Sequence, residues 1–226
     1  MSSVSVSEAL VKRYSCRAYL DKPVPKDILD RIFTQAAHTP SNNNMQPWKV
    51  HVLMGDKKDE LSKIVKDKTM EGKFHSKKGE SFDFRVYPEN LSEELWNRRV
   101  ACGELMYESI GVTREDKMGR VTQALKNGDF FDAPVGLIIT VDPCCEEGQL
   151  PDCGAFIQSL MLLAVEHGLA TCPQQYWALW ANTLREFLNT DDRVVVGLSL
   201  GYPDDNATIN SVRQPRLNSE EFVHYV

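Results

Sequence analysis

The sequence predicts a globular protein that contains both α-helices and β-strands, in one domain or slightly more than one. The chain has 226 residues, of which 42% are hydrophobic, and a chain of this length can bury a complete core. Some segments place apolar residues at helical spacing, whereas others alternate or run continuously in the manner of strands. The ordinary glycine content, charge and hydrophobicity exclude disorder, collagen and coiled coil as the main architecture.

The first half of the chain is predicted to hold three helices, one loop and one strand. Ser5 and Glu8 form a capping-box pattern at the start of the first helix, and Pro25 suits the first turn of the second. From Trp48 onward apolar and polar residues alternate, which is typical of a strand. The predicted order is a helix from Ser5 that ends near residues 13–17, a helix from Pro25 to about His38, a loop over residues 39–47, a strand from Trp48 to Met54 and a helix from about Asp56 to Thr69.

Residues 71–90 have no regular hydrophobic period and are predicted to form an insertion or lid. Long segments of this kind within a compact domain are usually functional or disordered. Their aromatic residues are suited to closing over a flat ligand, or they pack on the protein's own helices. These aromatics are Phe74, Phe82, Phe84 and Tyr87.

The second half alternates helices with two buried strands. The continuous apolar run Ala133–Val141 predicts a central strand. Asp152 is expected to cap a helix that reaches Gly168 and is apolar nearly all round, so it should be buried on several sides, including against another subunit. The remaining elements are a helix opened by Asn90 and Glu93 with Leu95, Val100, Leu105 and Met106 inside, a helix over 120–126, a helix from near Trp177 to Leu188, a strand from Val194 to Gly201 and an arm over 202–226.

Charge and cysteine content exclude several classes of function. The net charge of −6 argues against a nucleic-acid or membrane binder, because both need a basic surface. The longest apolar stretch is too short to span a bilayer, which takes about 20 residues, and the first seven residues do not resemble a signal peptide. Six cysteines without a C-x-x-C pair predict reduced thiols in a cytoplasmic protein and no metal site.

Common nucleotide-binding motifs are absent, and three polar segments are candidates for a binding site instead. There is no G-x-G-x-x-G or G-x-x-x-x-G-K-[ST] sequence, so a nicotinamide cofactor would not be held by a Rossmann motif. Arg13–Arg17 carries two guanidinium groups and a hydroxyl, which suit a phosphate or a carbonyl edge, or it is an exposed basic helix end. Pro40–Trp48 is either a site for a flat ring that has polar edges or a plain Asn-rich turn. Arg213–Arg216 is either a second site that can bind phosphate or part of a soluble tail.

In order and spacing, these segments resemble the nitroreductase/flavin reductase family of FMN enzymes over nearly the whole chain. The resemblance implies an α+β fold with a mixed sheet wrapped by helices, as a single domain over residues 1–226. It also implies an intertwined homodimer with exchanged C-terminal arms. The motifs that carry it are R-x-S-x-R from Arg13, P-S-x-x-N-x-Q-P-W from Pro40, D-x-G-A from Asp152, H-G-L-A-T-C-P from His167, G-Y-P from Gly201 and R-Q-P from Arg213.

The resemblance also implies where the FMN would lie, at the dimer interface. Arg13, Ser15 and Arg213 would hold the phosphate, Tyr14 would lie along the cofactor, and Arg17 would face the pyrimidine edge of the ring. The other subunit would contribute residues of one loop, and the segment after Cys172 would line the ring near its reactive nitrogen. The loop residues are Pro40, Ser41, Asn42 and Asn44, and the ring-lining residues are Pro173, Gln174 and Gln175. Many relatives have an acidic residue and a glycine after that proline, so which backbone N–H meets the flavin stays open here.

The implied activity is a ping-pong reaction in which NAD(P)H reduces the flavin and an acceptor then replaces it. The flavin carries the chemistry, so no catalytic side chain is assigned. The region of Tyr87–Pro88, Arg98–Arg99 and Phe130–Phe131 most resembles the branch that reduces nitroaromatics such as nitrobenzoates and dinitroanilines. Quinone or enone reduction and reductive dehalogenation remain alternatives, as does a non-catalytic flavin or thiol sensor suggested by Cys144–Cys145. The choice between NADH and NADPH stays open.

Overall fold

The computed structural model describes residues 4–72 and 80–226 and centres on a four-stranded sheet in the order β1-β2-β4-β3. All the pairings between these strands are antiparallel. The parallel component of the expected mixed sheet is an isolated bridge between Ser15 and Thr171. The strands are β1 (Trp48–Met54), β2 (Val135–Val141), β3 (Ala170–Gln174) and β4 (Arg193–Gly201).

The central strand prediction is confirmed, because every residue of β2 is buried. β2 pairs with β1 on one side and β4 on the other, and its register to β4 shifts between Ile139 and Thr140. β3 was not predicted. It has five residues, one of which is Pro173, and proline is tolerated here because β3 is an edge strand.

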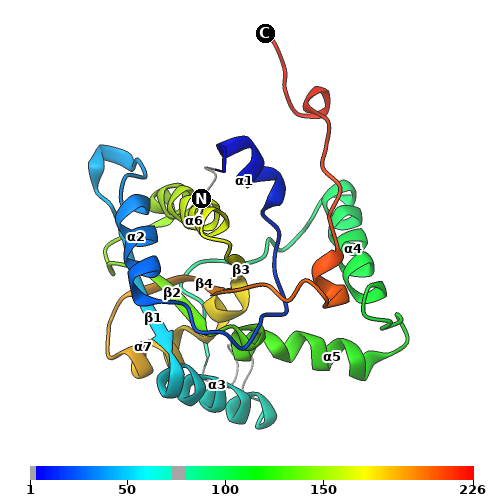
Figure 1. Cartoon of the computed structure of the whole chain (residues 1–226), viewed down its shortest axis with the longest axis horizontal. Helices are drawn as coiled ribbons and strands as arrows, with labels where there is room; N and C mark the ends of the chain where they lie inside the picture. The colour runs from blue at the N-terminus through cyan, green and yellow to red at the C-terminus, as the bar shows by residue number, and fades with distance from the viewer. Residues whose placement is uncertain (1–3, 73–79) are drawn as a thin grey trace.

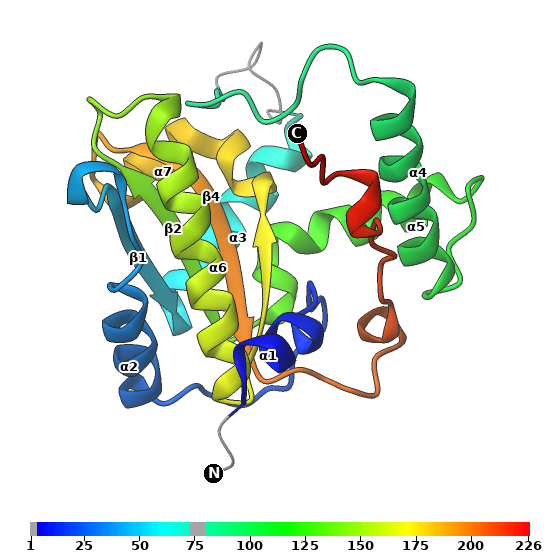
Figure 2. The ribbon, with the colours of Figure 1, turned by 90° about the horizontal axis from the view of Figure 1, so that it is seen from above.

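One face of the sheet is covered by α2 (Lys26–Ala36) and α6 (Leu150–Glu166), as Figure 2 shows. Leu160 of α6 packs in the same buried cluster as Leu137 and Leu198 of the sheet. The ring of Trp48 stacks on Phe156 at 4.6 Å between centroids. α1 (Val6–Lys12) lies against the end of α6. The α6 helix is therefore buried on the side that faces the sheet. It starts at Leu150, so Asp152 lies within its first turn and is not its cap, contrary to the prediction.

The opposite face is covered by α3 (Gly55–Met70), α7 (Ala181–Leu188) and two 3₁₀ segments, η3 (Lys126–Asp132) and η5 (Gln175–Trp180). Phe130 stacks on Trp177 at 4.3 Å between ring centroids, and both residues are fully buried. A side chain at Gly197 of β4 would collide with the Trp177 ring, so a glycine is needed there for close packing. Phe130 and Phe131 are both buried residues of the core.

α4 (Glu93–Glu108) and α5 (Lys117–Leu125) lie to one side of these layers (Figure 1). The prediction that α4 turns its apolar side chains into the core of the chain is wrong, because none of its residues is buried. Leu95 and Leu105 are 48% and 38% exposed. The helix stands away from the sheet, so its apolar side chains meet no core within this chain. Ser92, not Asn90, caps it, and α5 begins at Lys117, earlier than predicted.

The described part of the predicted lid is attached to the body of the protein at its beginning. Residues 73–79, which include Phe74, lie outside the described residues. Phe84 is 7% exposed, and the Arg193 guanidinium lies 4.1 Å from its ring centroid, so Phe84 is a core residue and not a lid aromatic. Phe82 and Tyr87 are exposed.

After β4 the chain runs as a mostly exposed arm past α4, and its C-terminus projects away from the body (Figure 1). Two short 3₁₀ turns interrupt it, η6 (Thr208–Ser211) and η7 (Ser219–Glu221). Gln214 of the arm donates a hydrogen bond to the Cys102 carbonyl oxygen of α4 at 3.1 Å. None of the helices in the described ranges has the length and apolar character needed to cross a membrane.

Candidate functional site

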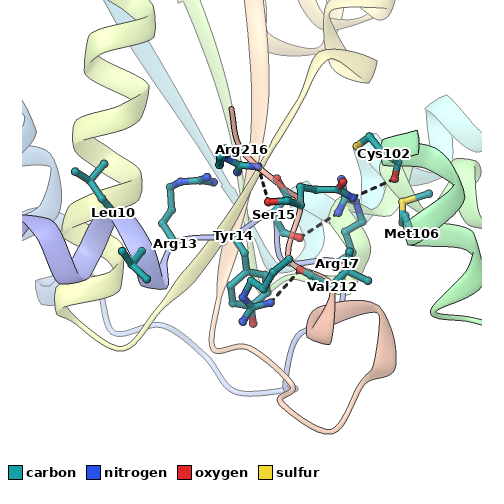
Figure 3. Close-up of a pocket in the computed structure, with 12 residues that line it drawn as sticks. Leu10, Arg13, Tyr14, Ser15, Arg17, Cys102, Met106, Val212 and Arg216 are labelled. Carbon is teal, nitrogen blue, oxygen red and sulfur yellow. Dashed lines mark hydrogen bonds between the residues drawn. The ribbon is translucent and has the colours of Figure 1, made fainter. Parts of the chain in front are cut away.

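A cavity of about 470 Å³ opens where the end of α1, helix α4 and the C-terminal arm meet (Figure 3). Four arginine side chains, together with Tyr14 and Ser15, contribute to its wall. We refer to it as the arginine cavity. Its lining residues are Leu10, Val11, Arg13, Tyr14, Ser15, Arg17, Cys102, Met106, Val212, Arg213, Gln214 and Arg216.

The local backbone explains why the residues of the R-x-S-x-R motif face the same cavity. α1 ends at Lys12, and Arg13 already has extended backbone angles. The following chain runs beside β3, where Ser15 pairs with Thr171 and the Cys16 N–H donates to the Thr171 carbonyl at 3.0 Å. Alternate residues of an extended chain point to the same side. Arg13, Ser15 and Arg17 therefore share one side, while Cys16 is buried on the other.

Asn210 joins the arm to this motif, and sequence reasoning missed it. Its Oδ1 accepts the Arg17 N–H at 2.9 Å, and its Nδ2 donates to the Ala18 carbonyl at 2.8 Å. The side chain is buried, although it lies 193 positions from Arg17 in the chain. No local pattern identifies an asparagine in a polar tail as a buried link, so only the fold reveals this role.

Arg213 is held in place by the backbone and by an aromatic ring. Its Nη1 donates to the carbonyl oxygens of Asn210 at 2.7 Å and Val212 at 3.1 Å. Its guanidinium carbon lies 4.0 Å from the centroid of the Tyr14 ring, a cation–π contact. The structure thus brings together Arg13, Tyr14, Ser15, Arg17 and Arg213, as the sequence predicted, and adds Arg216, Cys102 and Met106.

The arginine cavity carries positive charge that nearby carboxylates do not neutralise. Within residues 4–72 and 80–226, none of its four arginines forms an ion pair with a carboxylate. Burial lowers the pKa of Arg13, and the neighbouring charge of Arg216 lowers it further, yet an arginine stays protonated at neutral pH. Several guanidinium groups beside a hydroxyl form a donor set suited to a phosphate.

The predicted ring-lining residues continue from this cavity along β3. The Ser15–Thr171 bridge places them a few residues beyond the arginine cavity. Gln174 turns its side chain inward, where Nε2 donates to the Asn127 backbone oxygen at 3.0 Å and to Asn127 Oδ1 at 3.1 Å. Pro173 and Gln175 are exposed. The surface available to a ligand after Cys172 is therefore formed by Pro173, Gln175 and the backbone between them.

A second cavity, of about 550 Å³, lies beside Gln175. Its lining is mainly apolar and aromatic, which suits a flat organic molecule. We refer to it as the Gln175 cavity. Its lining residues are Thr69, Tyr87, Val121, Ala124, Leu125, Asn127, Gln175, Tyr176 and Leu179.

The asparagine-rich loop does not reach the arginine cavity within one chain, because none of its residues lines it. The loop lies at the start of α6, where the Asn42 N–H donates to both carboxylate oxygens of Asp152 at 3.2 Å. Asn43 and Asn44 have positive φ angles of 49° and 57°, which asparagine adopts more readily than most residues. Pro40, Ser41, Asn42 and Asn44 are thus presented at a different surface from the arginines.

The six cysteines are unpaired, and the pKa values of several of them are raised. All six are free, and the described residues hold no cluster of potential metal ligands. The Asp142 carboxyl group raises the pKa of Cys144, and burial raises that of Cys153 to about 12 and that of Cys172 to about 11. The thiolate is the reactive form of a cysteine, so the raised pKa values favour the less reactive thiol form of Cys144, Cys153 and Cys172.

The fold and the cavity together define an α+β protein with an arginine-lined cavity at a sheet edge. The family model described as the nitroreductase family matches residues 10–202. The chain belongs to the nitroreductase family.

Named relatives align with nearly the whole chain. The chain is 38% identical over 220 residues to a 4-nitrobenzoate reductase of Pseudomonas putida, covering 96% of this chain and 93% of the relative. It is 34% identical over 227 residues to a chloronitrobenzene nitroreductase of Comamonas testosteroni, covering 100% and 98%.

Solved structures share the fold closely. The FMN and NADPH-dependent nitroreductase NfnB from Sphigopyxis sp. strain HMH superposes with a TM-score of 0.93 at 36% identity, covering 98% of this chain and 99% of that one. The FMN-dependent nitroreductase NfnB from Mycobacterium smegmatis, solved in complex with NADPH, gives a TM-score of 0.90 at 30% identity and covers 98% of each chain.

Proposed function

We propose that this protein is an FMN-dependent nitroreductase that oxidises NAD(P)H and reduces nitroaromatic compounds in a ping-pong reaction. The arginine cavity is the observation that carries the proposal. It offers four guanidinium groups and a serine hydroxyl beside β3, without a carboxylate partner for those arginines among the described residues. The nitroreductase names of the relatives, and the FMN and NADPH in the names of similar structures, support the same activity.

The residues of the arginine cavity fit the phosphate of FMN. Arg13, Ser15 and Arg213 supply charged and neutral donors, and Arg216 adds a further cation at the same wall. Tyr14 holds the Arg213 guanidinium in position through its ring. FMN, when bound, supplies two-electron redox chemistry.

The other residues of the site orient the ring and keep water away from it. Arg17 donates one bond to the Ser15 carbonyl at 3.2 Å and would place a positive charge at the pyrimidine edge. Pro173, the backbone of Gln174, and Gln175 form the edge of the site along β3. The apolar wall of the Gln175 cavity excludes water from a bound acceptor. No side chain acts as a nucleophile in this proposal, and water supplies the proton.

The proposed active form is a homodimer. The loop residues Pro40, Ser41, Asn42 and Asn44 cannot complete the arginine cavity within their own chain, so in this proposal the partner supplies them. Apolar side chains on α1 and the arm also remain exposed, including Val11 at 80% and Phe222 at 60%. In this proposal the partner subunit covers these side chains. We also propose a cytoplasmic location, since all six cysteines are free thiols.

A spectroscopic titration tests the proposal directly. Purified protein should be yellow, lose its flavin absorbance when NADPH or NADH is added without oxygen, and recover it when a nitroarene follows. Sedimentation analysis of the same sample should give twice the mass of one chain. Protein that binds no FMN when supplied with it, or reduced flavin that no nitroarene reoxidises, would overturn the assigned activity.

A further inference from the structure

The guanidinium of Arg99 lies over two aromatic rings beside the Gln175 cavity. Its central carbon is 4.8 Å from the ring centroid of Tyr87 and 5.8 Å from that of Trp96. Tyr87 is itself part of the wall of that cavity. Cation–π contacts of this kind hold a planar guanidinium in a defined orientation. Arg99 is therefore a positioned positive charge at the edge of an apolar cavity.

The charge of Arg99 has no carboxylate partner in the described part of the chain, and its side chain makes no hydrogen bond there. The adjacent Arg98 differs, because it pairs with Glu94 one turn earlier on α4. Arg99 thus keeps its donors for another group, whereas Arg98 is already neutralised. The two neighbouring arginines form a matched pair for comparison.

The position of Arg99 on α4 connects the two cavities. Cys102 and Met106 line the arginine cavity, and Arg99 lies three and seven residues before them, which is the spacing of one helix face. That face therefore extends from the arginine cavity at Met106 to Tyr87 and the Gln175 cavity at Arg99. A molecule in the Gln175 cavity would have the expected position of the flavin ring, at Gln175, on one side. The Arg99 guanidinium would lie nearby.

We propose that Arg99 binds the carboxylate of the acceptor and that the preferred acceptors are nitroaromatic acids. The apolar wall of the cavity suits the aromatic ring, and a guanidinium matches a carboxylate through two parallel hydrogen bonds. The relatives do not decide this point, since one is named for the acid 4-nitrobenzoate and another for the uncharged chloronitrobenzene. This inference rests on the proposed nitroreductase function and narrows its substrate class.

The test compares 4-nitrobenzoate with its uncharged methyl ester in wild type, Arg99→Gln and Arg98→Gln. The wild type should prefer the acid, and Arg99→Gln should lower kcat/KM for the acid by about tenfold while changing the ester little. Arg98→Gln should behave as wild type with both compounds. Calorimetric titration of the oxidised FMN-loaded protein with 4-nitrobenzoate should show the same loss of affinity in Arg99→Gln, which gives a readout independent of turnover.

The possible contrary results are distinguishable. Equal losses for the acid and the ester would mean that Arg99 only supports Tyr87 and Trp96, and they would overturn the carboxylate role. Slower flavin reduction by NADPH but not by NADH in Arg99→Gln, with acid turnover unchanged, would assign the charge to the co-substrate phosphate and would also overturn it. Reduction of neither compound by the wild type would reject the proposed function itself, whereas calorimetry would still report whether Arg99 binds the acid.

Discussion

The Asp83 carboxylate accepts two hydrogen bonds from Arg185 Nη1, at 2.6 and 2.7 Å. The same carboxylate accepts the Val194 N–H at 2.7 Å, and the Asp83 carbonyl accepts a bond from Arg193 at 2.7 Å. These contacts attach the segment that follows residue 80 to α7 and β4. The described part of the predicted insertion is therefore fixed to the body of the protein at Asp83, before it continues toward Tyr87 and the Gln175 cavity.

Asp83→Ala should destabilise the fold, because it leaves the Arg185 guanidinium without its carboxylate partner in a largely buried place. The side chains of Asp83 and Arg185 are 13% and 25% exposed, and loss of one partner from such a pair costs about 2–4 kcal/mol. Urea denaturation measures the change. Asp30→Ala is the control, since its pair with Lys26 is exposed, and its effect should stay within about 0.5 kcal/mol. Equal effects of the two substitutions would contradict the importance of the Asp83 contacts.

Arg13→Ala and Arg213→Ala should leave folded proteins that bind FMN more weakly. A charge-assisted hydrogen bond contributes about 1.5–3 kcal/mol, which corresponds to roughly a 10- to 150-fold change in affinity. Fluorescence titration with FMN gives the dissociation constants. Arg31→Ala, at an exposed position on α2, should bind FMN normally. Unchanged affinity in both cavity variants would show that the arginine cavity does not hold the phosphate.

The double substitution Cys144→Ser and Cys145→Ser should retain most of the nitroreductase turnover. Neither residue lines the arginine cavity or the Gln175 cavity, and the neighbouring Asp142 disfavours the Cys144 thiolate by raising its pKa. Steady-state rates with saturating FMN provide the measurement. A loss of more than about tenfold, equivalent to about 1.4 kcal/mol in the barrier, would restore a thiol role.

Substitutions in the insertion should separate acceptor binding from folding. Tyr87→Ala removes a wall of the Gln175 cavity and should raise KM for aromatic acceptors, while flavin reduction by NAD(P)H changes little. Phe84→Ala should instead reduce stability by about 3–5 kcal/mol, because Phe84 is buried. Stopped-flow measurement of both half-reactions, together with urea denaturation, distinguishes these effects. An unchanged oxidative half-reaction in Tyr87→Ala would exclude this residue from acceptor binding.

Protonation linked to His51 should lower the stability of the protein as the pH drops below about 6.5. Burial lowers the pKa of His51 from its usual value of 6.5. Between the lowered folded pKa and 6.5, the unfolded chain binds the proton more readily, so protonation favours unfolding. His51→Gln should therefore lose less stability than wild type between pH 7.5 and 5.5. Urea denaturation at both pH values tests this, and parallel losses in the two proteins would contradict it.

Much of the sheet and its helices could be predicted because their signals are local. The alternation after Trp48 and the apolar run before Val141 correspond to β1 and β2. Ser5 and Glu8 form the predicted capping box of α1. β3 was missed because a run of five residues with Pro173 lacks a strand signal of its own. It forms because β4 supplies its hydrogen-bond partners.

The candidate site divides in the same way. The sequence by itself determined the family, through the order of its motifs. It also determined that the side chains of the R-x-S-x-R segment lie on one side, because alternate residues of an extended backbone point the same way. Only the tertiary structure decided that Asn210 links the arm to Arg17, that Phe84 is a core residue, and that Arg99 lies against Tyr87. The link between Asn210 and Arg17 joins distant positions of the chain, and the contact between Arg99 and Tyr87 depends on how α4 stands away from the sheet. Their energies arise from packing and solvent exclusion between elements, which no local sequence pattern encodes.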